Sequence, residues 1–599
     1  SLGPTGREPN LLARHACHYA RAMEPGPDAI IEAARAWISQ DPDPETVAEL
    51  EALIASGDHA ELRERMLAPL EFGTAGLRGI VGAGLGRMNR AVVIRATRGL
   101  AEYILAKNTD PRTLPVVVGF DGRLSSRRFA EDAVGVLVAA GIPVRFFEDP
   151  APTPLVAHAA RELSANAAIV ITASHNPPEY NGYKVYAANA AQIVSPVDQE
   201  ISARIAAVKS AKDVPLVAGA MGGSHAKAER VSSAFFDRYL AEVDAVRPRV
   251  ERDQQLCIVY TPMHGVGWRY VRQTFERSGY PNLHVVPEQA EPDGRFPTVN
   301  FPNPEEPGAL DLAMKLADEQ KADLILANDP DADRLAACIP TATGRFRQLT
   351  GNQVGLLLAD FMLEHALAAP RPLVASSIVS SPMLGAIAEA RGARFEQTLT
   401  GFKWIWNAAL DLEAQAGVRF AFGYEEALGY SVGRIVRDKD GISAALLLAD
   451  LAAHEKTRGR GLGERLDDLY RKHGLWVSLQ KSITRPGSDG LAEIEQAMQR
   501  LKDAPPETVG GVRVTRVTDF RSGAEARPRW LPATSLIALD LEGGGRVLVR
   551  PSGTEPKLKI YVDLRVPLAA SERVSAKEEE ALRAAQALAD DVADRVGLG

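Results

Sequence analysis

The chain alternates between short apolar runs and longer segments that are apolar on one face only. Ile169, Val170 and Ile171 form one such run, and β-branched residues of this kind suit a packed, pleated strand. Segments 127–141 and 152–163 instead repeat their apolar residues at helical spacing. Strands that alternate with helices in this way predict parallel sheets covered on both faces.

The same alternation returns over 256–334 and again over 373–430. In each of the three passes the last strand ends in an unusually polar loop. These loops are Ser174-His175-Asn176, the stretch from Asp329 to Arg334, and Glu425-Glu426. If three similar domains meet, three equivalent loops converge on one cleft, because α/β proteins place ligands at the carboxyl ends of their strands.

After about Leu475 the pattern changes to strands followed by one charged helix from about Ala576. We therefore expect an α/β protein of four domains: three topologically similar α/β domains with mixed or parallel sheets, and a C-terminal α+β domain, around a central cleft. A chain of 599 residues is too long for one core. The expected boundaries are 1–228, 229–343, 344–474 and 475–599, with the Gly- and Ala-rich stretch 217–230 as a linker.

The composition of the chain argues against several classes of binding partner. There are 69 Lys and Arg against 77 Asp and Glu, a net charge of −8, which argues against a nucleic-acid surface. No apolar run approaches the ~20 residues of a membrane span, so no membrane partner is expected. Cys17, Cys257 and Cys338 are widely spaced and form neither a disulfide framework nor a zinc motif. These features are typical of a cytoplasmic protein.

The first polar loop is tightly constrained. Pro177 and Pro178 prevent the strand that ends at Ile171 from continuing as a helix or a central strand. Ser174 and His175 are thus held at the carboxyl end of a strand. A serine that only bonds its own backbone in a turn is the alternative, and this loop alone does not decide between them.

The second loop, DPDADR, carries carboxylates at alternate positions, Asp329, Asp331 and Asp333. Such a density of like charge is unfavourable without a cation, and oxygen ligands suit Mg²⁺ or Ca²⁺. An EF-hand is excluded, because its glycine position holds Arg334 and its twelfth position holds Pro340. A solvated acidic turn remains the alternative.

Two further stretches suit phosphate. Arg78 stands in the glycine-rich EFGTAGLRG, and the stretch RPSGTEPKLK follows a strand with a cation, two hydroxyls and a glycine. An ordinary surface turn is the alternative for the latter. No G-x-x-x-x-G-K-[ST] motif and no G-x-S-x-G elbow occurs. Phosphoryl transfer through a serine accounts for the serine, the acidic cluster and the phosphate sites together.

Five motifs in order, FGTAGLRG, TASHNP, DPDADR, GYEEALG and RPSGTEPK, span about 480 residues. In these the chain resembles the α-D-phosphohexomutase superfamily (phosphoglucomutase/phosphomannomutase), and most closely its phosphopentomutase and glucose-1,6-bisphosphate synthase-like branch. The resemblance implies an isomerase that interconverts the 1- and 6-phosphates of glucose or mannose through a phosphoserine enzyme and a sugar bisphosphate. It also implies sugar phosphates as partners, with glucose 1,6-bisphosphate or an equivalent sugar bisphosphate as activator.

The resemblance also implies residue roles. Ser174 would carry the phosphate and, with Asp329, Asp331 and Asp333, bind Mg²⁺. His175, Arg78 and Lys403 would line the cleft as catalytic groups, any of which could move the hydroxyl proton. The implied substrate-binding positions are Arg334, Glu425, Ala427, His264, Arg550, Ser552, Gly553, Thr554 and Lys559.

One position departs from the family. Much of it has serine two residues after the sugar-binding glutamate, where this chain has Ala427. A hydroxyl partner for the sugar is therefore missing, and phosphopentomutase activity is the alternative within the class. A non-catalytic phosphosugar-binding protein is the alternative outside it, although the presence of Ser174 and all three aspartates argues against that.

Overall fold

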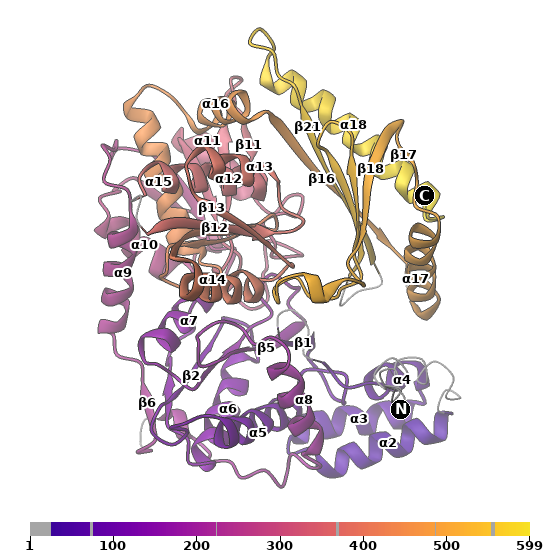
Figure 1. Ribbon diagram of the computed structural model, residues 1–599. Helices are drawn as coiled ribbons and strands as arrows, with labels where there is room; N and C mark the ends of the chain where they lie inside the picture. The colour runs from indigo at the N-terminus through magenta and orange to yellow at the C-terminus, as the bar shows by residue number, and fades with distance from the viewer. Residues whose placement is uncertain (1–25, 72–75, 223–224, 367–369, 486, 553–556) are drawn as a thin grey trace, which may run out of the picture.

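The computed structural model describes residues 26–71, 76–222, 225–366, 370–485, 487–552 and 557–599. Four sheets follow one another along the chain, and we call the parts that carry them domains I to IV. Figure 1 shows domain I at the bottom, domains II and III above it, and domain IV beside domain III. Among the described helices, none combines the length and apolarity needed to cross a bilayer.

Domain I has a six-stranded sheet in the order β1-β5-β4-β2-β3-β6. Strands β2, β3, β4 and β6 run parallel, β5 pairs antiparallel with β4, and β1 at the edge pairs antiparallel with β5. The strands are β1 (Leu77–Ile80), β2 (Val116–Phe120), β3 (Val144–Phe146), β4 (Ala167–Ile171), β5 (Tyr180–Tyr186) and β6 (Ala228–Arg230), and the main helices α5 (Arg90–Lys107), α6 (Ser126–Ala139), α7 (Thr153–Glu162) and α8 (Val197–Ala207).

The prediction that residues 217–230 form a linker is wrong for the last three of them. Ala228 to Arg230 form β6, whose register with β3 pairs Ala228 with Val144, so this segment completes the sheet of domain I. Ala228 is buried in the apolar core of that domain. A three-residue edge strand carries too few side chains to show an alternating pattern, which is why composition suggested a linker.

Domains II and III repeat the arrangement with fewer strands. Their sheets have the orders β11-β10-β9-β7-β8 and β13-β12-β14-β15, and both add antiparallel strands to a parallel centre. The strands are β7 (Ile258–Thr261), β8 (Leu283–Val285), β9 (Leu324–Ala327), β10 (Ala336–Pro340), β11 (Phe346–Gln348), β12 (Arg371–Ser377), β13 (Arg394–Thr398), β14 (Val418–Glu425) and β15 (Gly429–Val432). The helices are α9 (Ala234–Val246), α10 (Trp268–Arg277), α11 (Asp311–Gln320), α12 (Gly351–Glu364), α13 (Met383–Ala390), α14 (Phe402–Ala416), α15 (Gly441–Thr457) and α16 (Leu462–His473).

Domain IV is built differently, as the change of pattern predicted. Its sheet has the order β16-β21-β20-β19-β18-β17, with every pair given by its register antiparallel. The elements are β16 (Leu475–Thr484), α17 (Gly487–Asp503), β17 (Thr508–Val509), β18 (Val512–Asp519), β19 (Ile537–Leu541), β20 (Arg546–Pro551), β21 (Lys557–Val566) and α18 (Val574–Arg595). The α/β and α+β division of the chain is therefore confirmed.

From residue 26 onward, three helices lie ahead of the first sheet without a sequence prediction: α2 (Pro27–Gln40), α3 (Pro44–Ser56) and α4 (His59–Met66). They bury Trp37, Leu50 and Leu62 against Ile94 of α5. Glu49 accepts a hydrogen bond from the backbone N of Ala83 at 3.0 Å, which ties this helical unit to the start of the sheet.

Candidate active site

The loop after β4 holds Ser174 in a defined place. Ser174 has φ 53°, in the left-handed region, and its backbone N donates to Thr172 Oγ1 at 2.8 Å. Arg123, nearly fully buried, donates from Nη2 to the Ser174 carbonyl at 2.7 Å and pairs with Asp121 at 3.2 Å. Arg123 also donates to the carbonyls of Pro177 and Tyr180. A buried guanidinium bonded to several carbonyls over-determines the loop and supports its strained backbone.

The DPDADR loop comes to the same place. It follows β9 of domain II, and Asp329, Asp331 and Asp333 are all fully buried. Ser174 Oγ donates to Asp329 Oδ2 at 2.7 Å. The predicted convergence of the first two loops is therefore present in the structure.

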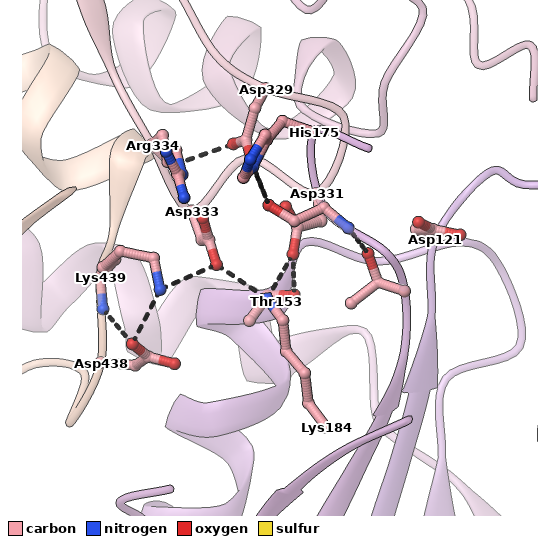
Figure 2. A network of polar contacts seen from close by, with 12 residues as sticks. Asp121, Thr153, His175, Lys184, Asp329, Asp331, Asp333, Arg334, Asp438 and Lys439 are labelled. Atoms are coloured by element: carbon pink, nitrogen blue, oxygen red, sulfur yellow. Dashed lines mark hydrogen bonds and ion pairs between the residues drawn. The ribbon is translucent and has the colours of Figure 1, made fainter. Parts of the chain in front are cut away.

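Two lysines balance the acidic cluster. Lys184 of β5 lies 2.8 Å from Asp331 Oδ2 and 2.9 Å from Asp333 Oδ2, and Lys439 lies 3.2 Å from Asp333 Oδ2. Figure 2 shows the two lysines approaching Asp333 from different elements. Burial and the neighbouring Asp331 hold the pKa of Asp329 well above its usual range. Burial acts the same way on Asp331, but Lys184 outweighs it and lowers the pKa of that carboxyl.

The cluster also fits a cation. Each aspartate offers one oxygen, and the three oxygens lie within 4.8 Å of one another. Among the described residues, Asp331 Oδ1 and Asp333 Oδ1 are buried without a hydrogen-bond partner. Buried carboxylate oxygens are rarely left without a partner, and an all-oxygen set suits a hard divalent ion.

Of the predicted catalytic groups, His175 contacts Ser174 and Arg78 contacts the same loop through Asn176. His175 Nδ1 lies 3.2 Å from Ser174 Oγ, and burial, followed by the charges of Arg334 and Arg78, holds the pKa of His175 well below its usual value. His175 is therefore neutral at pH 7. Arg78 Nη1 donates to Asn176 Oδ1 at 2.8 Å. Burial lowers the pKa of Arg78 to about 10, so it remains cationic at pH 7.

The third loop brings Glu425 to the end of β14. Its Oε1 accepts a hydrogen bond from the backbone N of Gly401 at 2.5 Å. Burial, reinforced by the charge of Glu426, raises the pKa of Glu425 to about 7. Arg334 Nη1 donates to the carbonyl of Ala427 at 3.0 Å, which joins this loop to the acidic loop of domain II.

Two predicted residues lie apart from the serine. Lys403 stands in the first turn of α14 with Nζ 5.9 Å from the Trp404 ring centroid, and burial lowers its pKa. His264 Nε2 lies 2.8 Å from Thr298 Oγ1. Within the described ranges, neither side chain hydrogen-bonds to Ser174 or to the three aspartates.

Only part of RPSGTEPKLK, the stretch predicted to bind phosphate in domain IV, lies within the described residues. Arg550 of β20 donates from Nη1 to Thr400 Oγ1 at 3.0 Å, across to domain III. Its Nε is buried and has no hydrogen-bond partner among the described residues. Lys559 of β21 stands opposite Arg550 in the sheet register. Gly553 and Thr554 lie outside the described residues, whereas Ser552 lies within them.

Sequence reasoning missed four residues of the site: Arg123, Thr153, Lys184 and Lys439. Thr153 Oγ1 donates to Asp331 Oδ2 at 2.7 Å. A signal existed for Lys184, because a lysine inside the strand-like run YNGYKVY must find a buried counter-charge. Arg123 and Thr153 act through contacts distant in sequence, and no local pattern identifies them.

Comparison with known families covers most of the chain. Three profiles described as phosphoglucomutase/phosphomannomutase, alpha/beta/alpha domains I, II and III, match residues 69–212, 235–343 and 350–473. The C-terminal domain of the same family matches residues 512–581. The four matches occur in chain order, each over one of the sheets described above.

Whole proteins match as well. A probable phosphomannomutase of Haemophilus influenzae is 40% identical over 80% of this chain and 93% of its own length. The human phosphopentomutase is 36% identical over 92% of this chain and 94% of its own length. The human glucose 1,6-bisphosphate synthase is 34% identical over 88% and 89%.

Among solved structures, one of a putative phosphomannomutase from Thermus thermophilus superimposes with a TM-score of 0.66 at 22% identity, over 88% of this chain and 99% of that one. At that identity the likeness concerns the fold.

Proposed function

The chain belongs to the phosphoglucomutase/phosphomannomutase family of intramolecular phosphotransferases, and we propose that it moves a phosphoryl group between the 1- and 6-hydroxyls of glucose or mannose phosphates through Ser174. Phosphoserine would give its phosphoryl group to the free hydroxyl of a sugar monophosphate. The bisphosphate so formed would turn around and return its other phosphate to Ser174. A sugar bisphosphate such as glucose 1,6-bisphosphate would prime the serine.

One observation carries the proposal. Ser174 Oγ lies 2.7 Å from Asp329 in a fully buried cluster of three carboxylates, on a loop locked by Arg123. A hydroxyl that only closed a turn would not need an acidic cluster from another domain beside it. Phosphoryl transfer depends on positioning and charge neutralisation, and a serine at a cation site provides both.

We assign Mg²⁺ to Asp329, Asp331, Asp333 and Ser174. When bound, it would neutralise charge on the transferring phosphoryl group. Lys184 and Lys439 already offset two of the carboxylates, so the site is close to neutral before a dianionic phosphate arrives. The other side chains of the site position the serine and its neighbours.

We assign proton transfer at the serine to His175. It is neutral at pH 7, and its Nδ1 lies 3.2 Å from Ser174 Oγ, within reach of the proton of an attacking hydroxyl. Arg78 remains cationic and bonds Asn176 in the same loop, which suits it to an anion. Lys403 has no such contact with Ser174 within the described residues.

We place the other phosphate of the substrate in domain IV, on Arg550, Ser552, Gly553, Thr554 and Lys559, and the sugar on Arg334, Glu425, Ala427 and His264. The Nε of Arg550, which has no partner in the part of the chain that the structure describes, supports this, because a guanidinium binds phosphate through two parallel donors. We keep 1–228, 229–343, 344–474 and 475–599 as the proposed domain boundaries, except that the first boundary moves past Arg230, where β6 of domain I ends.

A pentose phosphate is the second candidate. Ala427 cannot supply a side-chain hydroxyl to the sugar, and the human phosphopentomutase matches 92% of the chain. An assay of glucose 1-phosphate, mannose 1-phosphate and ribose 1-phosphate side by side, with Mg²⁺, separates the two. A kcat/KM highest for a hexose supports the first candidate; one highest for ribose 1-phosphate replaces it with the second.

A further inference from the structure

A segment of domain II from Phe296 to Glu305 borders the site and has no role in the proposed chemistry. The Phe296 ring centroid lies 5.1 Å from the Arg123 guanidinium carbon, and the Phe301 ring lies 6.3 Å from the His175 ring. The segment thus runs along the loop that carries Ser174. Its last residue, Glu305, brings a further carboxylate to this region.

The backbone of this segment is held firmly at its end. Asn303 Oδ1 accepts a hydrogen bond from the backbone N of Glu305 at 3.2 Å, and the Pro304 carbonyl accepts one from Gln348 Nε2 at 2.9 Å. The Glu305 side chain therefore starts from a fixed position, as a residue that selects among ligands requires.

Glu305 faces the residues that join the acidic loop to the sugar loop. Its Oε2 lies 3.9 Å from Arg334 Nη1, and the same nitrogen donates to the Ala427 carbonyl at 3.0 Å. Burial raises the pKa of Glu305, and the charges of Arg334 and Lys559 act against that rise. Nevertheless 41% of its side chain remains accessible. The carboxylate can therefore be reached from solvent while it lies beside Arg334.

The two cations near Glu305 mark the two ends of a substrate. Arg334 directly follows Asp333 of the transfer site, and Lys559 pairs in register with Arg550 of the phosphate site in domain IV. A sugar bisphosphate has one phosphate at each end and its ring hydroxyls between them. Glu305 lies 3.9 Å from Arg334, and the charge of Lys559 also acts on it, so a sugar held between these two cations would bring its hydroxyls near this carboxylate.

We propose that Glu305 accepts hydrogen bonds from ring hydroxyls of the sugar and helps determine which sugar is accepted, beside the position where Ala427 offers none. This inference rests on the proposed function. An ionised carboxylate has two oxygens that only accept, so it suits a pair of neighbouring hydroxyls. A site built to bond a substrate hydroxyl discriminates strongly against analogues that lack it.

The test compares Glu305→Gln with Glu306→Gln, the adjacent and equally charged residue, which is also exposed. Each variant and the wild type is assayed on glucose 1-phosphate, mannose 1-phosphate or ribose 1-phosphate, whichever is the best substrate, and on its monodeoxy analogues. We expect Glu305→Gln to lower kcat/KM at least tenfold, mainly through KM, while Glu306→Gln matches the wild type. For at least one deoxy analogue, wild type and Glu305→Gln should be equal, because the hydroxyl that Glu305 binds is absent.

Two results would overturn the inference. An unchanged kcat/KM in Glu305→Gln would show that the carboxylate does not contact the sugar. An equal loss on every analogue would show that Glu305 acts only through Arg334. A wild type inactive on all sugar phosphates is a different outcome, because it refutes the proposed function and this inference with it. Intact mass of each variant after priming, which reports phosphate on Ser174, checks that the transfer site is intact.

Discussion

The proposed transfer site around Ser174 and the proposed phosphate site of domain IV differ in how their side chains are held. Around Ser174, the three aspartates are fully buried and two lysines and a threonine bond them, with contributions from three domains. In domain IV, Arg550 reaches domain III through one hydrogen bond to Thr400, and its Nε has no partner among the described residues. The first region is held in place by several contacts, whereas the second leaves one guanidinium donor, Arg550 Nε, without a protein partner among the described residues. Changes in the first should therefore lower kcat, and changes in the second should raise KM.

The largest expected effect is that of Ser174→Ala. Without the hydroxyl no phosphoserine forms, and kcat should fall at least about 10⁴-fold, the scale seen when a nucleophile is removed. Binding of sugar phosphate, measured by calorimetry, should persist because domain IV is unchanged. Ser164→Ala is the matched control, since Ser164 has a similar φ of 48° in an exposed turn of the same domain. Near-normal turnover by Ser174→Ala would refute the proposal that Ser174 carries the phosphoryl group.

The second-largest loss of activity is expected for Asp333→Asn. Lys184 keeps Asp331 as a partner and Lys439 keeps Asp438, so neither lysine is left unpaired and the fold should survive. Loss of a cation ligand beside the phosphoryl group should lower kcat about 10²- to 10³-fold and raise the Mg²⁺ concentration needed for half-maximal rate. Asp318→Asn, exposed on α11 of the same domain, is the control. Full activity of the wild type in excess chelator would contradict the metal assignment.

The sequence predicted most of the parallel core of this molecule, because buried runs such as Ile169–Ile171 carry their own signal. It did not predict β5, which returns antiparallel after two prolines and carries Lys184 between Tyr183 and Val185. It also placed a linker where Ala228 to Arg230 add an edge strand. Short or polar strands are specified by their neighbours in the sheet rather than by their own pattern.

The candidate site divides in the same way. Ser174, His175 and the three aspartates stand in short motifs, and the structure brings them together. Arg123 and Lys439 support the site through contacts with residues more than 50 positions away, so no window of sequence reveals them. Gly553 and Thr554 lie outside the described residues, and their assignment stays a prediction.

The variant Arg550→Ala tests the proposed phosphate site of domain IV. Hydrogen bonds to charged groups contribute about 1.5–3 kcal/mol each, so KM should rise roughly tenfold to a hundredfold. The rise should be similar for the 1-phosphate and the 6-phosphate, because each presents its resident phosphate to domain IV. Arg513→Ala, an exposed arginine of the same sheet, is the control. A loss confined to one direction would show that Arg550 is not the shared anchor.

The smallest expected effect is the pH dependence of folding stability that Glu425 contributes. Its pKa is about 7 in the folded protein against 4.5 as the ordinary value. Between these values the folded state binds a proton that the unfolded state has released, so stability should fall as pH rises through this window, by at most about 1.4 kcal/mol per pH unit. Glu425→Gln should remove that fall, and Glu389→Gln, exposed in the same domain, should not. Urea unfolding midpoints at pH 5.5 and 7 measure it; an identical pH dependence in wild type and Glu425→Gln would contradict the assignment.

Isotope transfer tests the role of Ser174 most directly. The enzyme is primed with glucose 1,6-bisphosphate labelled in both phosphates, the label is located by peptide mapping, and the labelled enzyme is mixed with its unlabelled sugar monophosphate. The account predicts label on Ser174 that passes to the sugar within one turnover, and none bound by Ser174→Ala. Label that stays on Ser174 while the sugar phosphate is interconverted at the full rate would contradict it.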